Sequence, residues 1–235
     1  MTGLDSPAPE PVPAWLGQLV AAAQTVTAAE LSRFLPPPEG GRESAVLMLF
    51  GSDDRGPNVL ITERSAGLRH HPGQPSFPGG RVDPGDDGPV ATALREAVEE
   101  TGLDPAGVQV LATLPAVFLP VNSSVVIPVL AWWRRPTAVG VVDPIEVASV
   151  HVVPIAELAD PVRRIRIRHP SGYVGPAFKA SGLVIWGFTA GLLDRVIHLA
   201  GWERPWDRDR MEDLPPDAVA LSIRAAEAAG APEAP

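Results

Sequence analysis

The segment VATALREAVEETG, residues 90–102, constrains the fold of this chain more than any other feature. At about 100° per residue, a helix here places Glu96, Glu99 and Glu100 on one face, because positions i, i+3 and i+4 are neighbours. The opposite side carries residues suited to packing: Val90, Leu94, Ala97, Val98 and Thr101. Gly102 ends the pattern, so the segment predicts a helix that packs on one side and presents three carboxylates on the other.

Three like charges on one short helix face repel each other, and a cation would relieve that repulsion. Carboxylate oxygens are hard ligands that suit Mg²⁺ or Mn²⁺ rather than zinc. The alternative is a solvated acidic face on which Arg95 serves only as an ion-pair partner. The glycine pair Gly79–Gly80, upstream of the helix, favours a functional site, because glycine lets a backbone turn sharply or approach a ligand closely.

The composition excludes several classes of function. The 235 residues include no cysteine, which excludes disulfides, zinc–thiolate sites and thiol nucleophiles. The net charge of −9 argues against general nucleic-acid binding, although a metal ion or a local arginine cluster still allows an anionic substrate to bind. The N-terminus has no signal-peptide pattern, and the longest apolar run, residues 125–133, is too short to span a membrane. We therefore expect a globular cytoplasmic protein without a membrane or nucleic-acid partner; its oligomeric state is open, a homodimer included.

The chain reads as one domain of the α+β class. Residues 1–13 are expected to be a disordered Pro-rich lead, residues 14–229 a single domain with helical extensions at both ends, and residues 230–235 a flexible tail. Strands are predicted over residues 44–50, 58–62, 108–119, 124–133, 147–155 and 163–168. Further helices are predicted over residues 14–34 (one or two short ones), 183–200 and 211–229, and a long loop over residues 65–88. Strands on both sides of the acidic helix favour a mixed sheet in a sandwich over a regular βαβ series.

The segment Gly80–Leu103 resembles the Nudix box, which is a Gly, a spaced acid, and then Arg-Glu-aliphatic-x-Glu-Glu-x-Gly-aliphatic. The second half matches position by position, at Arg95, Glu96, Ala97, Glu99, Glu100, Gly102 and Leu103. The first half departs from the pattern. An aspartate, Asp86, stands for the spaced glutamate, and its gap to Arg95 is one residue longer than in the general box.

The longer gap and the preceding loop resemble the coenzyme A diphosphatase branch of the Nudix family. Its upstream signature is roughly L-L-T-x-R-S-x-x-L-R-x-H-x-G-x-x-x-F-P-G-G, and residues 60–80 read LITERSAGLRHHPGQPSFPGG. The positions that coincide are Thr62, Arg64, Ser65, Leu68, Arg69, His71, Gly73, Phe77, Pro78, Gly79 and Gly80. The tracts GPAF (175–178) and IWGFTAGLL (185–193) also look like that branch. The resemblance covers roughly residues 44–200.

The resemblance implies a Nudix α/β/α sandwich around a mixed sheet and metal-dependent hydrolysis of a diphosphate joined to another moiety. The metal would be Mg²⁺ or Mn²⁺. Glu96 and Glu100 are the first-choice metal ligands, Glu99 is a third ligand or the base, and Arg95 holds one of these carboxylates in place. The sequence alone does not distinguish which of these glutamates is a metal ligand and which is the base, because coupled carboxylates titrate together. The role of Asp86 is open.

The coenzyme A branch implies 3′-phospho-AMP and 4′-phosphopantetheine, or its acyl form, as products. Such a substrate carries a third phosphate, so cations beyond the metal are needed. Arg64 and Arg69 are the first candidates, with surface ion pairing as their alternative, and Gly79–Gly80 would contact the substrate through the backbone. His71 is expected to hold the loop by hydrogen bonds, with acid–base work as the alternative.

A strand over residues 163–168 would put Arg164, Arg166 and Arg168 on one face and Ile165 and Ile167 on the other. We expect a charged edge strand that blocks aggregation, and phosphate binding is the alternative.

Three functions compete. The first is hydrolysis of coenzyme A or its thioesters. The second is hydrolysis of another nucleotide, such as ADP-ribose, a dinucleoside polyphosphate or a damaged nucleoside triphosphate. The third is a Nudix-fold binding module without catalysis. The intact set of Glu96, Glu99 and Glu100 argues against the third, and the signature at residues 60–80 favours the first over the second.

Overall fold

The structure is a computed structural model that describes residues 11–228. Its main sheet has the order β3-β2-β1-β7-β5, with β4 added to β1, β6 to β7 and β8 to β2. The strands are β1 (Arg42–Asp53), β2 (Gly56–Arg64), β3 (Pro75–Ser76), β4 (Gly79–Arg81), β5 (Val108–Thr113), β6 (Val117–Leu119), β7 (Ser124–Trp133) and β8 (Val147–Pro154). Strand β1 runs parallel to β7 and antiparallel to β2 and β4, so the sheet is mixed, as predicted.

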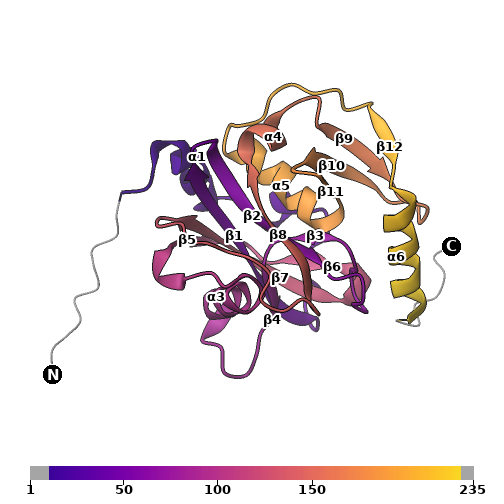
Figure 1. The fold of residues 1–235 in the computed structure, drawn as a ribbon, viewed down its shortest axis with the longest axis horizontal. Helices are drawn as coiled ribbons and strands as arrows, with labels where there is room; N and C mark the ends of the chain where they lie inside the picture. Colours follow the sequence, from indigo (N-terminus) through magenta and orange to yellow (C-terminus); the bar gives the residue numbers. More distant parts are fainter. Residues whose placement is uncertain (1–10, 229–235) are drawn as a thin grey trace.

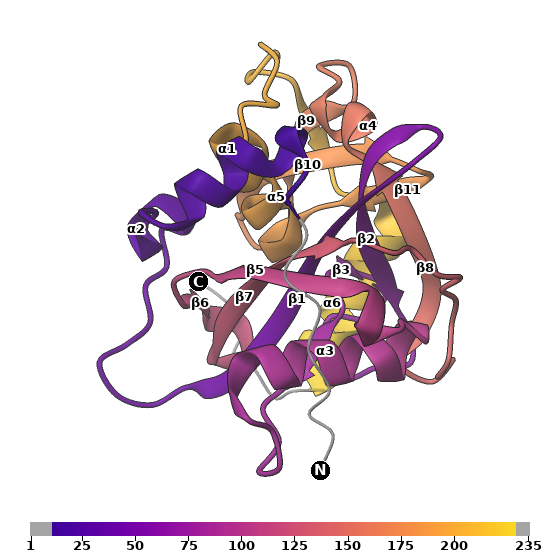
Figure 2. The same ribbon diagram turned by 90° about the vertical axis from the view of Figure 1, so that its left-hand side faces the viewer.

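Both faces of the main sheet are covered, and Figure 2 shows it between α3 (Gly88–Thr101) on one side and α1 (Ala14–Ala23) and α5 (Gly187–Leu199) on the other. Strand β1 supplies alternate residues to the two layers: Ala45, Leu47 and Leu49 pack with the α3 side, and Met48 and Phe50 with the α1 and α5 side. This double burial explains why the strand reads as a continuous apolar run. The expected Nudix-type sandwich is confirmed.

Helix α3 is longer by two residues than its periodicity predicts, because Pro89 in its first turn suits a helix start. Gly102 ends it in the left-handed conformation, with a φ of 69°. The buried face of α3 differs from the expected one and includes part of the acidic face. Glu100 is buried, whereas Val98, which was expected to pack, is 37% exposed. The cause is β4, where Gly80 leaves room for the Glu96 carboxylate and the backbone N–H of Gly79 donates to Glu100.

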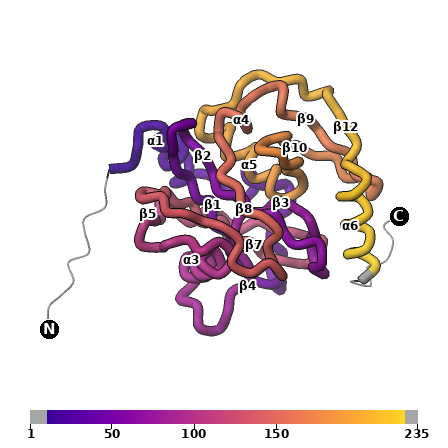
Figure 3. Tube along the Cα trace, in the orientation of Figure 1, coloured from indigo at the N-terminus to yellow at the C-terminus, as the bar shows by residue number. Residues whose placement is uncertain are grey.

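A second sheet of the order β11-β10-β9-β12 lies beside the first, and Figure 1 shows it with α5 and α6. Its strands are β9 (Arg164–Arg168), β10 (Val174–Ala180), β11 (Leu183–Ile185) and β12 (Met211–Asp213). Helix α6 (Pro216–Ala228) follows β12. The remaining short elements are α2 (Ala28–Leu31), η1 (Pro105–Gly107), η2 (Pro120–Asn122) and α4 (Ile155–Ala159). The Cα trace shows the segment from β9 to α6 gathered on one side of the main sheet (Figure 3).

Two predicted helices begin later than expected, because each is preceded by a strand. Ser181 and Gly182 both have positive φ, and this tight turn folds residues 183–185 back onto β10. In the predicted helix over 211–229, Pro215 and Pro216 disfavour a helical start upstream, and residues 211–213 instead pair with β9.

Three further expectations need correction. The loop over 65–88 contains the short strands β3 and β4, and the stretch 108–119 is divided into β5 and β6, separated by residues that include Pro115. The expected edge strand over 163–168 is internal, since β9 lies between β10 and β12.

The expected Pro-rich lead and C-terminal tail fall largely outside the described residues; residues 11–13 have no regular structure before α1. Among residues 11–228, no helix is both long and apolar enough to cross a membrane.

Candidate active site

The glycine pair and two of the three glutamates meet where α3 crosses β4. Strand β4 pairs with the first part of β1, with Ala45 opposite Gly80. The backbone N–H of Gly79 donates a hydrogen bond to Oε2 of Glu100 at 3.2 Å. The Cα of Gly80 lies so close to Glu96 that an added Cβ would stand 2.3 Å from Oε1. The absence of a side chain at Gly80 therefore leaves the space in which the Glu96 carboxylate lies, and the backbone N–H of Gly79 holds Glu100.

These two carboxylates are poorly hydrated. Glu100 is only 3% exposed, and burial raises its pKa to about 8, against the opposing influence of the Arg64 charge and the Gly79 N–H. Burial also raises the pKa of Glu96, and the neighbouring charges of Glu99 and Glu146 raise it further. Negative charge is therefore costly at this point, and a bound cation would lower that cost.

Arg95 connects Asp86 to the glutamates. Its Nε and Nη2 bind the two oxygens of Asp86, each at 3.0 Å. Its Nη1 lies 3.0 Å from both Glu96 and Glu99, and Nη2 also donates to the carbonyl of Arg81 at 3.0 Å. Arg95 thus holds the helix acids and the end of β4 together.

Asp86 is fixed by its surroundings. Arg95, the backbone N–H of Asp83 and the hydroxyl of Thr92 hold the pKa of Asp86 well below its usual range. The Thr92 hydroxyl donates to it at 2.8 Å and the Asp83 N–H at 2.9 Å. The acid that departs from the general motif is therefore an anchor for Arg95.

Glu99 lies apart from the buried pair. Its side chain is 58% exposed and its carboxylate accepts from Arg95. Sequence reasoning did not find Glu146, an exposed residue just before β8, whose charge raises the pKa of both Glu96 and Glu100. No local spacing signals Glu146, because it comes to α3 only through the folded chain.

The donor set fits a hard divalent cation. Within residues 11–228, no three His, Cys, Asp or Glu side chains are already gathered for coordination. Glu96 and Glu100, however, are hard oxygen donors with unfavourable charge, and Mg²⁺ commonly binds through one or two carboxylates together with substrate phosphates and waters. Two protein carboxylates of this kind are enough for such an ion.

The family model of the NUDIX domain matches residues 41–172. The chain belongs to the Nudix family. Among curated relatives, it is 36% identical over 167 residues to NudL of Citrobacter koseri, described as an uncharacterised Nudix hydrolase, covering 65% of this chain and 79% of that one. It is also 36% identical over 172 residues to the mitochondrial Nudix hydrolase 15 of Arabidopsis thaliana, covering 70% of this chain and 60% of that one.

A solved Nudix hydrolase, RenU of M. smegmatis, shares the fold with a TM-score of 0.50 at 21% identity, over 72% of this chain and 92% of that one. The protein is therefore a Nudix hydrolase that acts on a nucleotide diphosphate, a reaction that this family generally carries out with divalent metal ions. The matched residues contain β4, α3 and all the acids described above.

The end of β2 and the loop that leads to β3 carry three of the predicted upstream residues, Arg64, Arg69 and His71. Arg64 ends β2, and its charge lowers the pKa of Glu100, so this arginine lies within electrostatic reach of the buried acids. Its Nε donates to the carbonyl of His70 at 3.4 Å. Arg69 is exposed on the same loop.

His71 has a structural environment. Its φ is 53°, and its Nδ1 lies 3.1 Å from Oε1 of Gln74. Burial, and secondarily the charge of Arg64, lowers the pKa of His71. The lowered pKa favours the neutral ring, and the contact with Gln74 joins two residues of the same loop.

Arg164 of β9 does not line this site. Arg164 is 1% exposed and pairs with Asp194 at 2.5 Å and with Glu203 at 3.3 Å. Its guanidinium also lies over the rings of Phe178 and Trp206. The expectation of a solvent-facing row of arginines is wrong for Arg164, because the second sheet and α5 enclose it.

Proposed function

We propose that this Nudix hydrolase cleaves the diphosphate bond of coenzyme A or its thioesters, releasing 3′-phospho-AMP and 4′-phosphopantetheine or its acyl form. The observation that carries the proposal is the proximity of Arg64, from the motif over residues 60–80, to the buried Glu100 of the Nudix helix. The motif that resembles the coenzyme A branch therefore contributes a cation beside the acids expected to do the chemistry.

Glu96 and Glu100 would hold Mg²⁺ or Mn²⁺, since burial makes both carboxylates poor anions on their own. When bound, the ion would neutralise diphosphate oxygens and acidify a water molecule. Arg95, fixed by Asp86, keeps Glu96 oriented toward Gly80.

The other residues would bind the substrate and move a proton. Arg64 supplies a planar donor for phosphate oxygens, with Arg69 from the same loop as a second one. The backbone at Gly79–Gly80 allows the diphosphate a close approach. Glu99, exposed and held by Arg95, is the first choice for the group that accepts a proton from the attacking water. Glu146 is the second, because its charge reaches both buried acids.

The proposal is tested by incubating the purified protein with coenzyme A and Mg²⁺ or Mn²⁺ and separating the products by chromatography. We expect two products with the masses of 3′-phospho-AMP and 4′-phosphopantetheine. Intact coenzyme A beside consumed ADP-ribose or nucleoside triphosphate would overturn the substrate assignment. A protein that cleaves none of these with either metal would overturn catalysis itself.

Glu100→Gln tests the metal assignment. Because a metal ion supplies several kcal/mol of transition-state stabilisation, turnover should fall by about three orders of magnitude. Mg²⁺ should raise the melting temperature of the unmodified protein but not of this variant. The matched control is Glu227→Gln, which removes an exposed carboxylate on α6 and should change neither property. Full activity in Glu100→Gln would overturn the assignment.

Glu99→Gln and Glu146→Gln identify the proton acceptor. Removing the acceptor should lower kcat and flatten the acidic limb of the pH–rate profile. The variant that keeps this limb eliminates its residue as the base, and retention of the limb in both would overturn the two assignments together.

A further inference from the structure

Coenzyme A carries a 3′-phosphate in addition to its diphosphate, and the two arginines proposed above for phosphate oxygens, Arg64 and Arg69, both come from the end of β2 and the loop after it. Arg164 is enclosed and already paired with Asp194 and Glu203. The charge of Arg64 reaches Glu100, where the diphosphate would bind. A cationic site on another element would serve the 3′-phosphate if the proposed function holds.

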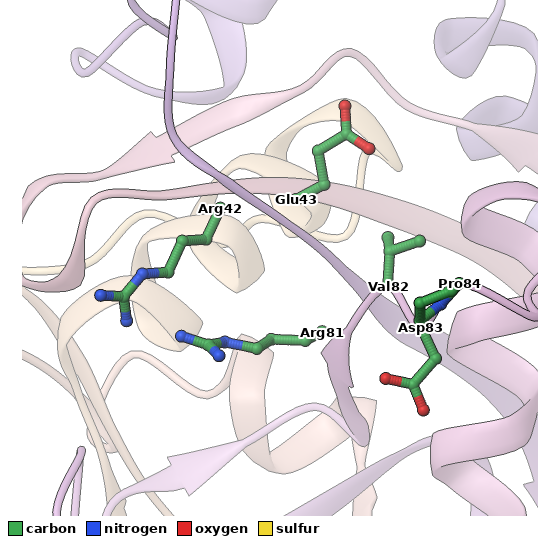
Figure 4. A pocket seen from close by; sticks show the side chains of 6 residues that line it. All are labelled: Arg42, Glu43, Arg81, Val82, Asp83 and Pro84. Carbon is green, nitrogen blue, oxygen red and sulfur yellow. The ribbon is translucent and has the colours of Figure 1, made fainter.

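A hollow beside β4 contains such a site. It is lined by Arg42, Glu43, Arg81, Val82, Asp83 and Pro84, and Figure 4 shows the two arginine side chains extending in the same direction. We propose that Arg42 and Arg81 form a phosphomonoester site that receives the 3′-phosphate of the nucleotide. This inference rests on the proposed function and adds to it the group that selects coenzyme A over nucleotides that lack this phosphate.

The sheet register places the two arginines together. Arg81 is opposite Ser44 in the antiparallel pair of β4 and β1. Arg42 is two residues before Ser44, so its side chain leaves β1 on the same face as Arg81. Residues in this diagonal relation are within reach of each other's long side chains.

Neither guanidinium has a counter-ion in the part of the chain that the structure describes. Within residues 11–228, the side chains of Arg42 and Arg81 make no ion pair or hydrogen bond. The acids of the hollow do not neutralise them: Asp83 lies 3.8 Å from Arg95 instead, and Figure 4 shows Glu43 pointing away from both guanidiniums. Two neighbouring uncompensated cations in a chain of net charge −9 form a cradle for a doubly charged anion.

The cradle is connected to the acid centre by three consecutive residues. Gly79 contacts Glu100, Gly80 contacts Glu96, and Arg81 follows them in β4. The Cβ direction of Gly80 is toward α3, so the side chain of Arg81 leaves the opposite face. Strand β4 pairs only with β1 among the described strands. A nucleotide that crosses the unpaired side of β4 would place its diphosphate at the acids and its 3′-phosphate at the arginines.

A binding experiment tests the cradle without turnover. Calorimetry would compare adenosine 3′,5′-bisphosphate, AMP and inorganic phosphate with the full chain in the presence of Mg²⁺. We expect the bisphosphate to bind at least about tenfold more tightly than AMP, and this preference to disappear in the double variant Arg42→Ala/Arg81→Ala. Arg204→Ala, which removes an exposed arginine in the irregular segment after α5, is the matched control and should keep the preference.

The kinetic experiment uses coenzyme A and dephospho-coenzyme A. The ratio of the two kcat/KM values should fall about tenfold in the double variant, and Arg42→Lys/Arg81→Lys should restore part of it. Equal binding of bisphosphate and AMP by the unmodified protein would overturn the inference, as would inorganic phosphate binding as tightly as the bisphosphate, which indicates a free-phosphate site. If coenzyme A is not cleaved but the bisphosphate preference depends on the two arginines, the proposed function fails and the phosphomonoester site stands.

Discussion

Gly80 lies against the carboxylate of Glu96, so that a methyl group at position 80 would come within 2.3 Å of Oε1 and 2.4 Å of Cδ. Its neighbour Gly79 faces backbone instead: a Cβ there would lie 2.3 Å from the carbonyl oxygen of Ala45 and 2.7 Å from the Cα of Val46. The two adjacent glycines thus have different structural roles. One leaves room for a site carboxylate, and the other lets two strands pair.

Alanine substitutions at the two positions should distinguish these roles. Gly80→Ala should leave the free energy of unfolding within about 1 kcal/mol, because the end of a flexible side chain moves aside, but should lower turnover about 100-fold by displacing Glu96. Gly79→Ala should cost about 3 kcal/mol or more, because backbone cannot move aside. Urea denaturation and initial rates measure the two effects. Full activity in Gly80→Ala would mean that the position of Glu96 is unimportant.

Asp86→Asn and Glu99→Gln each remove one carboxylate from Arg95, in different settings. The Asp86 side chain is 7% exposed and accepts four hydrogen bonds, whereas the Glu99 side chain is 58% exposed. Asp86→Asn should lower the melting temperature, and Glu99→Gln should leave it nearly unchanged, because exposed ion pairs contribute little to stability. Thermal unfolding followed by circular dichroism compares them. An equal decrease in both variants would contradict the anchoring role of Asp86.

The pH dependence of stability should carry a contribution from His71. Burial holds its folded pKa below the ordinary 6.5, so the unfolded chain takes up a proton first as the pH falls. The stability that the neutral His71 ring contributes is therefore fully present above pH 6.5. It is lost as the pH decreases toward the lower pKa of His71 in the folded protein. Asn, which tolerates positive φ, is the matched replacement.

The stability difference between the unmodified protein and His71→Asn should be larger at about pH 7.5 than at about pH 5.5. Denaturant titrations at both pH values measure it, and taking the difference cancels the contributions of other titrating groups that the substitution leaves unperturbed. A difference that does not change with pH would show that His71 titrates alike in both states.

Arg164 is predicted to contribute to stability and not to substrate recognition. Asp194→Asn weakens the pair at 2.5 Å around this buried guanidinium and should cost about 3 kcal/mol. The KM for coenzyme A should stay unchanged, because Arg164 lies among Asp194, Glu203 and Trp206 rather than beside Glu100. A raised KM with unchanged stability would return β9 to the list of phosphate-binding candidates.

Local periodicity was enough to locate the site helix. The spacing of Glu96, Glu99 and Glu100, the stop at Gly102 and the glycine pair before the helix are properties of neighbouring residues, and the structure has them nearly as predicted. The predicted strands over 44–50, 58–62, 124–133 and 147–155 correspond to β1, β2, β7 and β8 for the same reason. Short strands such as β11 and β12 were missed, because they exist only through pairing with distant partners.

The sequence by itself determined the family, the acidic helix and the identity of the carboxylates, since these depend on residue type and spacing along a few turns of chain. Only the tertiary structure decided which acids are buried, that Asp86 anchors Arg95, and that the charge of Glu146 reaches Glu96 and Glu100. It also decided that Arg164 is enclosed, while Arg42 and Arg81 have no counter-ion within residues 11–228. The physical reason is that pKa, pairing and accessibility depend on what lies around a charge in space. At the pair of Gly80 and Glu96, those surroundings come from a strand 16 residues away along the chain.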